Sequence, residues 1–302
     1  MNFRTAAGYI LSFLSIVLTL DKDFDDINAN GVWDPGEDLV ISSKQDKFIT
    51  IGGAVTEVIF NLGFGNSVIA VDQSSTFPKK VKDLPEIGYV RMISSERVLS
   101  KFPKKIFSSK DLAPKTAIKQ FQESPVDFKI YNAPKNIIEI YNLIDQLSSD
   151  LNVQDLGVIL KDKIKSDVAS IDNISSQFKR KPKIVFFMNP AAGSYVGAGS
   201  GTVANYLIEL MGGENIFSDE FTSYQKVSKE SIFMKNPDII LVAAHNSGES
   251  PSDHFSKNSE FKSLKAVRKN NIIEISMSDL TMGTSFASNA LSIITRLNYD
   301  SK

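Results

Sequence analysis

The stretch Ile93–Ile106, ISSERVLSKFPKKI, recurs in altered form as Val227–Ile240, VSKESIFMKNPDII. Its glutamate, proline and a lysine each reappear 134 residues later, so the match keeps its register. Each copy predicts a serine N-cap, a glutamate in the first helical turn, where the dipole favours it, and a proline that ends the helix before a buried strand. The repeat therefore predicts two similar α/β lobes, and a cleft between lobes is where small ligands bind.

The composition is that of an ordinary soluble chain. With 302 residues, 42% hydrophobic and 23% charged, the protein is long enough for two domains with separate cores. The 34 basic and 35 acidic side chains nearly cancel, which gives no indication of a nucleic-acid partner. The sequence has no set of nucleophile and base with the spacing of a catalytic site, so we expect a binding protein and not an enzyme.

The first 20 residues predict export. One charge, Arg4, precedes an apolar run from Ala6 to Leu20, which is short for a membrane span of about 20 residues and typical of a signal peptide. No small-x-small cleavage site is evident near Leu20, so an uncleaved anchor is the alternative. The chain has no cysteine, which excludes a lipid-modified N-terminal cysteine, disulfides and thiolate metal sites. We expect a periplasmic protein.

The remaining chain divides into segments by its periodicity. Phe48–Ile51 and Ser67–Val71 predict strands on either side of a helix over Val55–Leu62, which is a βαβ start. Apolar residues then recur at helical spacing from residue 135 to 178, which predicts one long connecting helix, or two abutting helices that meet near Ser148–Asn152. The expected division is a leader at 1–20, an acidic linker at 21–45, an N-terminal α/β lobe at 46–134, the connecting helix at 135–178 and a C-terminal α/β lobe at 179–302.

Three further stretches carry a family resemblance. Ile51–Gly63 (IGGAVTEVIFNLG), Val71–Pro78 (VDQSSTFP) and Leu84–Arg91 (LPEIGYVR), in this order with the repeated helices, resemble the haem-binding proteins of bacterial ABC importers. These belong to the helical-backbone class (class III) of periplasmic binding proteins, which also carries cobalamin and ferric siderophores. The resemblance runs from about Phe48 to the C-terminus. It implies two Rossmann-like lobes with parallel sheets joined by a long backbone helix, and a monomer.

The resemblance also implies roles for four residues. Tyr89, of the Gly-Tyr-x-Arg motif, corresponds to the ligand of the haem iron, and Arg91 can stabilise its anion or bind a haem propionate. Glu96 and Glu230 correspond to the lobe-tip glutamates that pair with arginines of the permease. From the residues alone, both glutamates are also explained as acids that favour the start of a helix.

The chemistry of tyrosine suits oxidised iron. Ferric iron is a hard cation, a phenolate is a hard anionic oxygen, and tyrosine is one of the axial ligands known for haem. Free tyrosine has a pKa near 10, so a nearby cation and the metal itself must favour the anion. Without the resemblance, an isolated Gly-Tyr pair more often marks an aromatic side chain packed into a loop.

Histidine is scarce around the predicted cleft. Some relatives place a histidine at the first turn of the C-terminal lobe, where this chain has Met188–Tyr195 and no histidine. His245 follows a strand predicted at Asp238–Ala244, at the carboxyl end where parallel sheets bind ligands, so it is a candidate haem contact or sixth ligand, with a solvated loop position as the alternative. We expect His254 at the surface and Tyr195 as a second contact near the ligand.

An acidic stretch before the lobes fits a calcium loop. Asp26-Ile-Asn-Ala-Asn-Gly-Val-Trp-Asp-Pro-Gly-Glu37 matches the pattern D-x-N-x-N-G-x5-E at every position. Hard oxygen ligands in this order suit Ca²⁺, although the paired helices of an EF-hand are missing and a solvated linker is the alternative. The predicted ligands are Asp26, Asn28, Asn30, the Val32 carbonyl, Asp34 and Glu37.

The sequence thus predicts an exported protein that captures haem in the interlobe cleft and delivers it to an ABC importer. The first alternative is the same scaffold with a ferric siderophore or cobalamin as ligand. The second is a membrane-anchored, calcium-dependent module whose lobes contact proteins.

Overall fold

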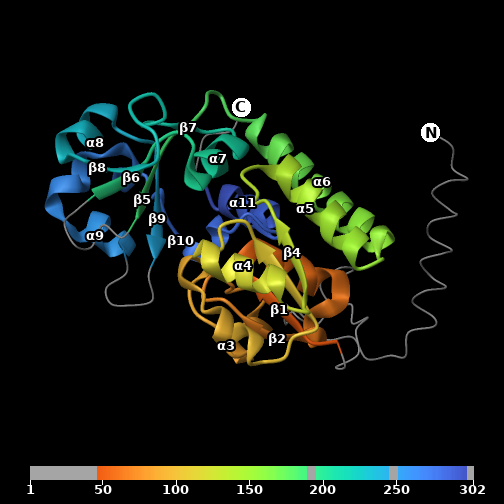
Figure 1. Cartoon of the computed structure of the whole chain (residues 1–302). Coiled ribbons are helices and arrows are strands. Elements are labelled where there is room, and N and C mark those ends of the chain that lie inside the picture. Colours follow the sequence, from red (N-terminus) through yellow and green to blue (C-terminus); the bar gives the residue numbers. More distant parts are fainter. Residues whose placement is uncertain (1–45, 189–194, 245–250, 298–302) are drawn as a thin grey trace, which may run out of the picture.

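The computed structural model describes residues 46–188, 195–244 and 251–297, which form two α/β lobes (Figure 1). Predictions for the leader, the calcium loop and His245 fall outside these residues. Within the described ranges, no helix is both long enough and apolar enough to span a bilayer.

The N-terminal lobe has a wholly parallel sheet, as predicted. Its four strands are ordered β2-β1-β3-β4, so the chain begins in the middle of the sheet and winds outward in both directions. All four residues of β1 are buried, and three of them are apolar. The elements are β1 (Phe48–Ile51), α2 (Gly53–Ile59), β2 (Val68–Val71), α3 (Ser95–Leu99), β3 (Lys105–Ser109), α4 (Lys115–Glu123) and β4 (Asp127–Tyr131).

The sheet of the C-terminal lobe is mixed, which corrects the prediction of two parallel sheets. Its order is β10-β9-β5-β6-β8: the first three strands are parallel, and β6 pairs antiparallel with both β5 and β8. A short strand, β7, runs parallel to the start of β5 and pairs with it on the edge opposite β9. The elements are β5 (Lys183–Met188), β6 (Tyr195–Ala198), α7 (Val203–Leu210), β7 (Glu214–Asn215), β8 (Tyr224–Val227), α8 (Lys229–Lys235), β9 (Ile239–Ala244), α9 (Pro251–Lys257), α10 (Lys265–Arg268), β10 (Ile272–Ser276) and α11 (Phe286–Thr295).

Two helices that pack side by side connect the lobes (Figure 1). They are α5 (Ile137–Asp150) and α6 (Gln154–Ser175). The prediction of one long helix over 135–178 is therefore wrong, and the alternative of two helices that meet near Ser148–Asn152 is correct. The chain also reverses there, with Asn152 at a φ of 58°. The tight packing of the two helices requires Gly157, because a Cβ on it would lie 2.6 Å from the Ser148 hydroxyl.

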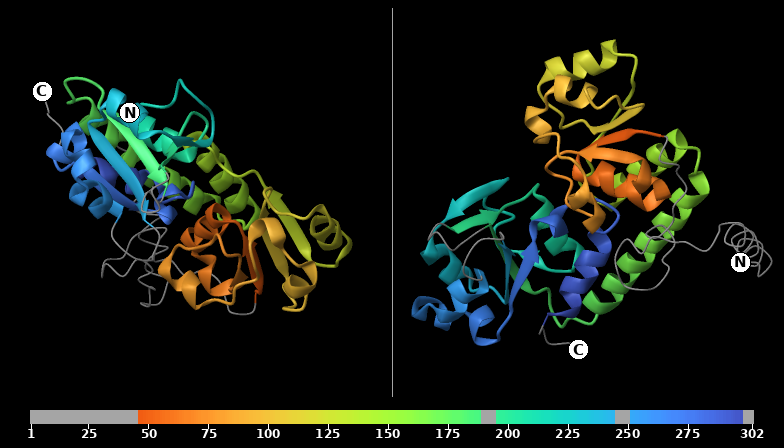
Figure 2. Two further views of the ribbon diagram at one scale, coloured as in Figure 1. Left: turned by 90° about the vertical axis from the view of Figure 1, so that its left-hand side faces the viewer. Right: turned by 90° about the horizontal axis from the view of Figure 1, so that it is seen from below.

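The 22-residue helix α6 is the element shared by both lobes. It contacts the turn Phe60–Phe64 of the N-terminal lobe and α11 of the C-terminal lobe (Figure 2). Its buried residues Leu160, Ile164 and Ile171 join one apolar cluster with residues of both lobes. A packed core continuous across the junction limits how freely the lobes can move.

The repeated sequence unit forms the same structure twice. Ser94 caps α3 and Ser228 caps α8, each through its side-chain oxygen, as predicted. A residue with a left-handed φ then precedes the proline in each unit: Phe102, three residues after the end of α3, at 52°, and Asn236, the C-cap of α8, at 41°. The equivalence of the two units therefore extends to backbone conformation.

Candidate functional site

A cavity of about 280 Å³ lies between the two lobes. The N-terminal lobe supplies the start of α2 and the loops that follow β2, β3 and β4, whereas the C-terminal lobe supplies one residue of α7 and the segment Leu280–Met282. Because these loops leave the carboxyl ends of parallel strands, the cavity has the position expected for a ligand site in α/β lobes. Its lining is Gly52, Gly53, Ala54, Val55, Ser74, Tyr89, Val90, Arg91, Ser109, Asp111, Ala133, Pro134, Val203, Leu280, Thr281 and Met282.

Tyr89 lies at the mouth of this cavity on a fixed loop. Its neighbour Gly88 has a φ of 110°, and the Gly88 carbonyl accepts a hydrogen bond from the Gln73 N–H at 2.9 Å. On the other side, the Tyr89 carbonyl accepts from the Met92 N–H at 2.7 Å. Hydrogen bonds therefore hold the backbone of Tyr89, while its side chain is 44% exposed. Most aromatic side chains in the described part of the chain are buried, so this exposure is unusual.

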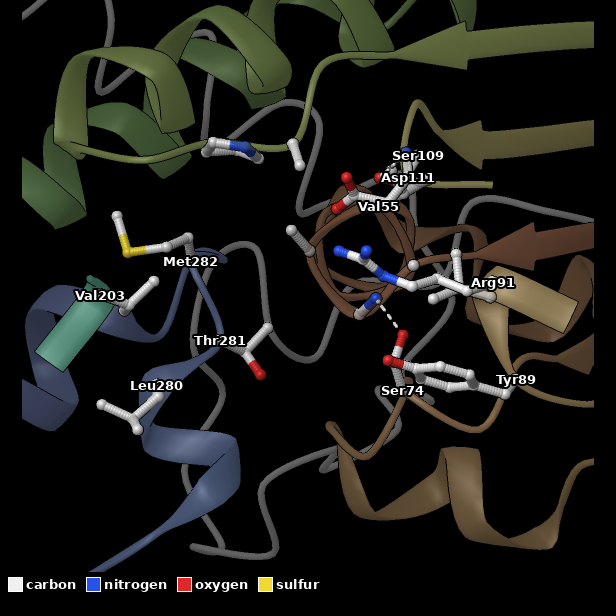
Figure 3. A pocket seen from close by; sticks show the side chains of 16 residues that line it. Val55, Ser74, Tyr89, Arg91, Ser109, Asp111, Val203, Leu280, Thr281 and Met282 are labelled. Atoms are coloured by element: carbon white, nitrogen blue, oxygen red, sulfur yellow. Dashed lines mark hydrogen bonds between the residues drawn. The ribbon is translucent and has the colours of Figure 1, made fainter. Parts of the chain in front are cut away.

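Arg91 lies beside Tyr89 and also lines the cavity. Figure 3 shows both side chains on the N-terminal side, facing Thr281, Leu280 and Met282 of the other lobe across the opening. Arg91 is exposed, so its guanidinium can reach an anionic group of a bound molecule and form two parallel hydrogen bonds with a carboxylate.

Buried Asp72 organises the floor of the cavity, and sequence reasoning missed it. Its carboxylate accepts hydrogen bonds from the Gly52 N–H at 2.7 Å, the Ser74 N–H at 2.9 Å and the Ser75 hydroxyl at 2.7 Å. These bonds fix the loop after β2 against the start of α2. Gly52 has a φ of 104°, and a Cβ there would lie 2.6 Å from the Cβ of Ser109, so only glycine fits. The signal was the VDQSS stretch, whose Asp and Ser residues are typical of such turns.

The opposite wall is mainly apolar. Val203, Leu280 and Met282 face the N-terminal lobe, and Thr281 is the polar residue among them. A phenol and a guanidinium on one side and aliphatic side chains on the other suit a ligand with a hard metal centre, anionic groups and apolar faces. In the ranges that the structure describes, no group of three or more His, Cys, Asp or Glu residues could hold a metal ion by itself.

Two predictions around the C-terminal lobe are wrong. Tyr195 is 4% exposed and packs in an aromatic cluster with Phe187, Phe255 and Phe261, away from the cavity lining. His254 is half-buried, not at the surface, and its Nε2 lies 2.7 Å from the Tyr195 Oη. Burial raises the pKa of Tyr195. The pair is therefore a structural hydrogen bond within the lobe.

Of the other predicted site residues, Glu96 and Glu230 are among the described residues and the rest are not. His245 follows Ala244, the last residue of β9, and lies outside the described residues, as do Asp26, Asn28, Asn30, Val32, Asp34 and Glu37. Glu96 and Glu230 are described: each lies in the first turn of its helix, on α3 and α8 respectively, and each is exposed.

A cleft between two α/β lobes that share a long helix defines a two-lobed ligand-binding protein. Residues 49–277 match the model of the periplasmic binding protein family, so the chain belongs to this family. Its fold is that of class III periplasmic binding proteins, and its task is binding for transport, not catalysis.

Three of the similar proteins are named for heme or vitamin B12. The chain is 27% identical to the periplasmic heme binding protein HutB of Vibrio cholerae, with 83% of this chain and 98% of that structure covered and a TM-score of 0.72. It is 27% identical to the high-affinity heme uptake system protein IsdE of Staphylococcus aureus over 66% of this chain and 69% of that protein. It is 22% identical to the vitamin B12-binding protein of Vibrio vulnificus over 66% of this chain and 72% of that protein.

Proposed function

We propose that this protein captures haem in the interlobe cleft and delivers it to the permease of an ABC importer. The observation that carries the proposal is Tyr89, a 44% exposed phenol at the mouth of the cavity, next to Arg91. Haem combines ferric iron, two carboxylates and a flat apolar ring. The tyrosine, the arginine and the aliphatic wall of the other lobe match these three features in turn.

Two similar proteins named for heme support haem as the ligand. Both matches at 27% identity are named for heme, whereas the vitamin B12-binding protein is 22% identical. Cobalamin or a ferric siderophore on the same scaffold is the alternative. Cobalamin already carries ligands on its metal, so a protein phenolate has no comparable role there.

We further propose that the protein docks on its permease through Glu96 and Glu230. Both carboxylates are exposed and occupy the same position of the repeated unit, one in each lobe. Two like acidic sites suit a partner with two like basic sites, since complementary charge steers association and fixes register. In this account the protein is a monomer, is exported to the periplasm by residues 1–20, and has a calcium-binding loop at 26–37 ahead of its first lobe.

Titration of the purified protein with three ligands tests the proposed ligand. Hemin, cyanocobalamin and a ferric hydroxamate siderophore are added in turn, and binding is followed by absorbance and by isothermal titration calorimetry. We expect saturable binding of hemin at one site and at least 100-fold weaker binding of the other two. Tight binding of cyanocobalamin with no saturable response to hemin would establish the alternative.

A further inference from the structure

Glu57 joins the two lobes behind the cavity. It lies in α2 of the N-terminal lobe and is fully buried. Its Oε1 accepts hydrogen bonds from the Thr284 hydroxyl at 2.9 Å and from the Ser285 N–H at 2.5 Å. Asn61, also in the N-terminal lobe, donates from its side-chain amide to the Thr284 hydroxyl. One buried carboxylate therefore holds the start of α11 against the other lobe.

The contact completes a helix end. Ser285 is the N-cap of α11 but forms no side-chain cap hydrogen bond. The first N–H groups of a helix lack partners within the helix, and the helix dipole favours a negative charge beside them. Glu57 supplies that charge and acceptor from the opposite lobe. Because a buried carboxylate is unfavourable without such donors, the contact favours one relative position of the lobes.

Gly283 allows the close approach of the carboxylate. A Cβ at this position would lie 2.1 Å from the Glu57 Oε2 and 2.5 Å from its Cδ. Real Cβ atoms do not come so close to other heavy atoms, so any other residue at 283 would displace the carboxylate or the loop. The contact can therefore be disrupted from either lobe.

The joined segments are also the two walls of the cavity. The start of α2 contributes Gly53, Ala54 and Val55, and Leu280–Met282 forms the opposite wall immediately before Gly283. The walls already approach each other at one end, where a Cβ on Gly53 would lie 3.2 Å from the Thr281 Cγ2. Glu57 follows Gly53 by four residues and Ser285 follows Thr281 by four, so the Glu57–Ser285 contact is well placed to set the width of the cavity.

We propose that Glu57 is a positioning residue that fixes the separation of the two cavity walls. It does so through the N-terminus of α11 and does not line the cavity itself. Any opening of the lobes at this end must separate the carboxylate from Thr284 and Ser285. The inference concerns the empty protein, and only its second readout below rests on the proposed function.

The absence of cysteine makes a direct distance measurement simple. Spin labels on Lys119→Cys in α4 and Lys257→Cys in α9 report the distance between the lobes by double electron–electron resonance. We expect one narrow distance distribution for the parent and a distribution at least twice as broad in Glu57→Ala and in Gly283→Ala. Glu57→Gln is measured in the same way, and its matched control is Glu86→Gln, which removes an exposed carboxylate.

Circular dichroism identifies variants that keep their fold, and Thr284→Val replaces any that do not. Distributions as narrow as that of the parent in folded Glu57→Ala and Gly283→Ala would overturn the proposal. A broad distribution in Glu86→Gln as well would also overturn it, because the effect would not be specific to the interlobe contact.

Hemin binding separates this inference from the proposed function. Glu57→Gln is expected to bind hemin about tenfold more weakly than the parent with an unchanged absorbance spectrum, since the ligand contacts remain. A changed spectrum with unchanged affinity would contradict a positioning role. If the parent itself fails to bind hemin, the proposed function falls, and the distance distributions still decide the role of Glu57.

Discussion

Ser94 and Ser228 perform the same task in the two lobes: each side-chain oxygen accepts a hydrogen bond from the N–H three residues on, at 3.3 Å from Arg97 and at 3.1 Å from Ser231. The two serines stand 134 residues apart, at equivalent positions of the repeated unit. The lobes therefore share the same N-cap hydrogen bond as well as the same type of fold.

This equivalence predicts equal and independent costs of removing the caps. Ser94→Ala and Ser228→Ala should each lower the free energy of unfolding by about 1 kcal/mol, and the double variant by about 2 kcal/mol, because the sites share no partner. Urea unfolding followed by circular dichroism measures both effects. Replacement by aspartate, which can also cap, is the control and should retain most of the stability. A loss confined to one lobe would show that the units are not energetically equivalent.

Phe102 occupies a position that its counterpart fills with Asn236. Both residues are left-handed, a conformation that suits asparagine far better than phenylalanine, and Phe102 is 80% exposed, so its ring gains little from packing. Phe102→Asn should therefore raise the free energy of unfolding by about 1 kcal/mol. The reciprocal Asn236→Phe should lower it, since the Asn236 Oδ1 also accepts from the Lys265 N–H at 2.9 Å. Thermal unfolding of the two variants gives the comparison, and a destabilised Phe102→Asn would contradict the argument.

Asp238 predicts how the stability of the C-terminal lobe depends on pH. Burial acts to raise the pKa of its carboxyl, but hydrogen bonds from Arg180, Lys265 and the Lys183 N–H outweigh burial and hold the pKa below the ordinary 3.8. A folded-state pKa below the unfolded value means that the carboxylate stabilises the fold above about pH 3.8 and loses this contribution as pH falls through the folded-state pKa.

Asp238→Asn should accordingly cost about 2 kcal/mol at pH 7, because it weakens charge-assisted hydrogen bonds. The difference from the parent should shrink as the pH falls below 3.8. Urea titrations at a series of pH values test both points. A difference that stays constant down to the lowest pH would mean that the charge of Asp238 is not what stabilises the lobe.

Charge reversal tests the docking surface. Glu96→Lys and Glu230→Lys should each weaken association with the reconstituted importer about tenfold, or about 1.4 kcal/mol, with a smaller effect at high salt. Stimulation of importer ATPase activity by the loaded protein is the measurement. Glu86→Lys reverses another exposed charge of the N-terminal lobe and should leave the stimulation unchanged. Equal losses in all three variants would argue against a specific surface.

The parts that sequence could predict are those set by local chemistry. The serine caps, the proline after each helix and the alternation of strand and helix all act over a few residues, and the structure confirms them. The motif around Tyr89 was likewise visible because glycine, tyrosine and arginine are close in sequence. The structure puts both Tyr89 and Arg91 on the cavity wall, and their contacts with haem stay a prediction.

The parts that sequence missed depend on contacts between distant residues. The reversal between α5 and α6 depends on Gly157 packing against Ser148, which helical periodicity does not reveal. The antiparallel direction of β6 is set by its pairing with β5 and β8, and the sequence of a four-residue strand does not specify its partners. Glu57 appeared only as part of a family stretch, since its partners lie 227 and 228 residues later in the chain.

The central claim is that the Tyr89 phenolate binds the iron of haem, and the absorbance spectrum of the hemin complex tests it most directly. The parent should show the charge-transfer absorption of a ferric tyrosinate, and Tyr89→Phe should lose it and bind hemin at least tenfold more weakly. Arg91→Ala, as the matched control, should keep the absorption and lose affinity alone. A ferric tyrosinate spectrum that persists unchanged in Tyr89→Phe would contradict the account.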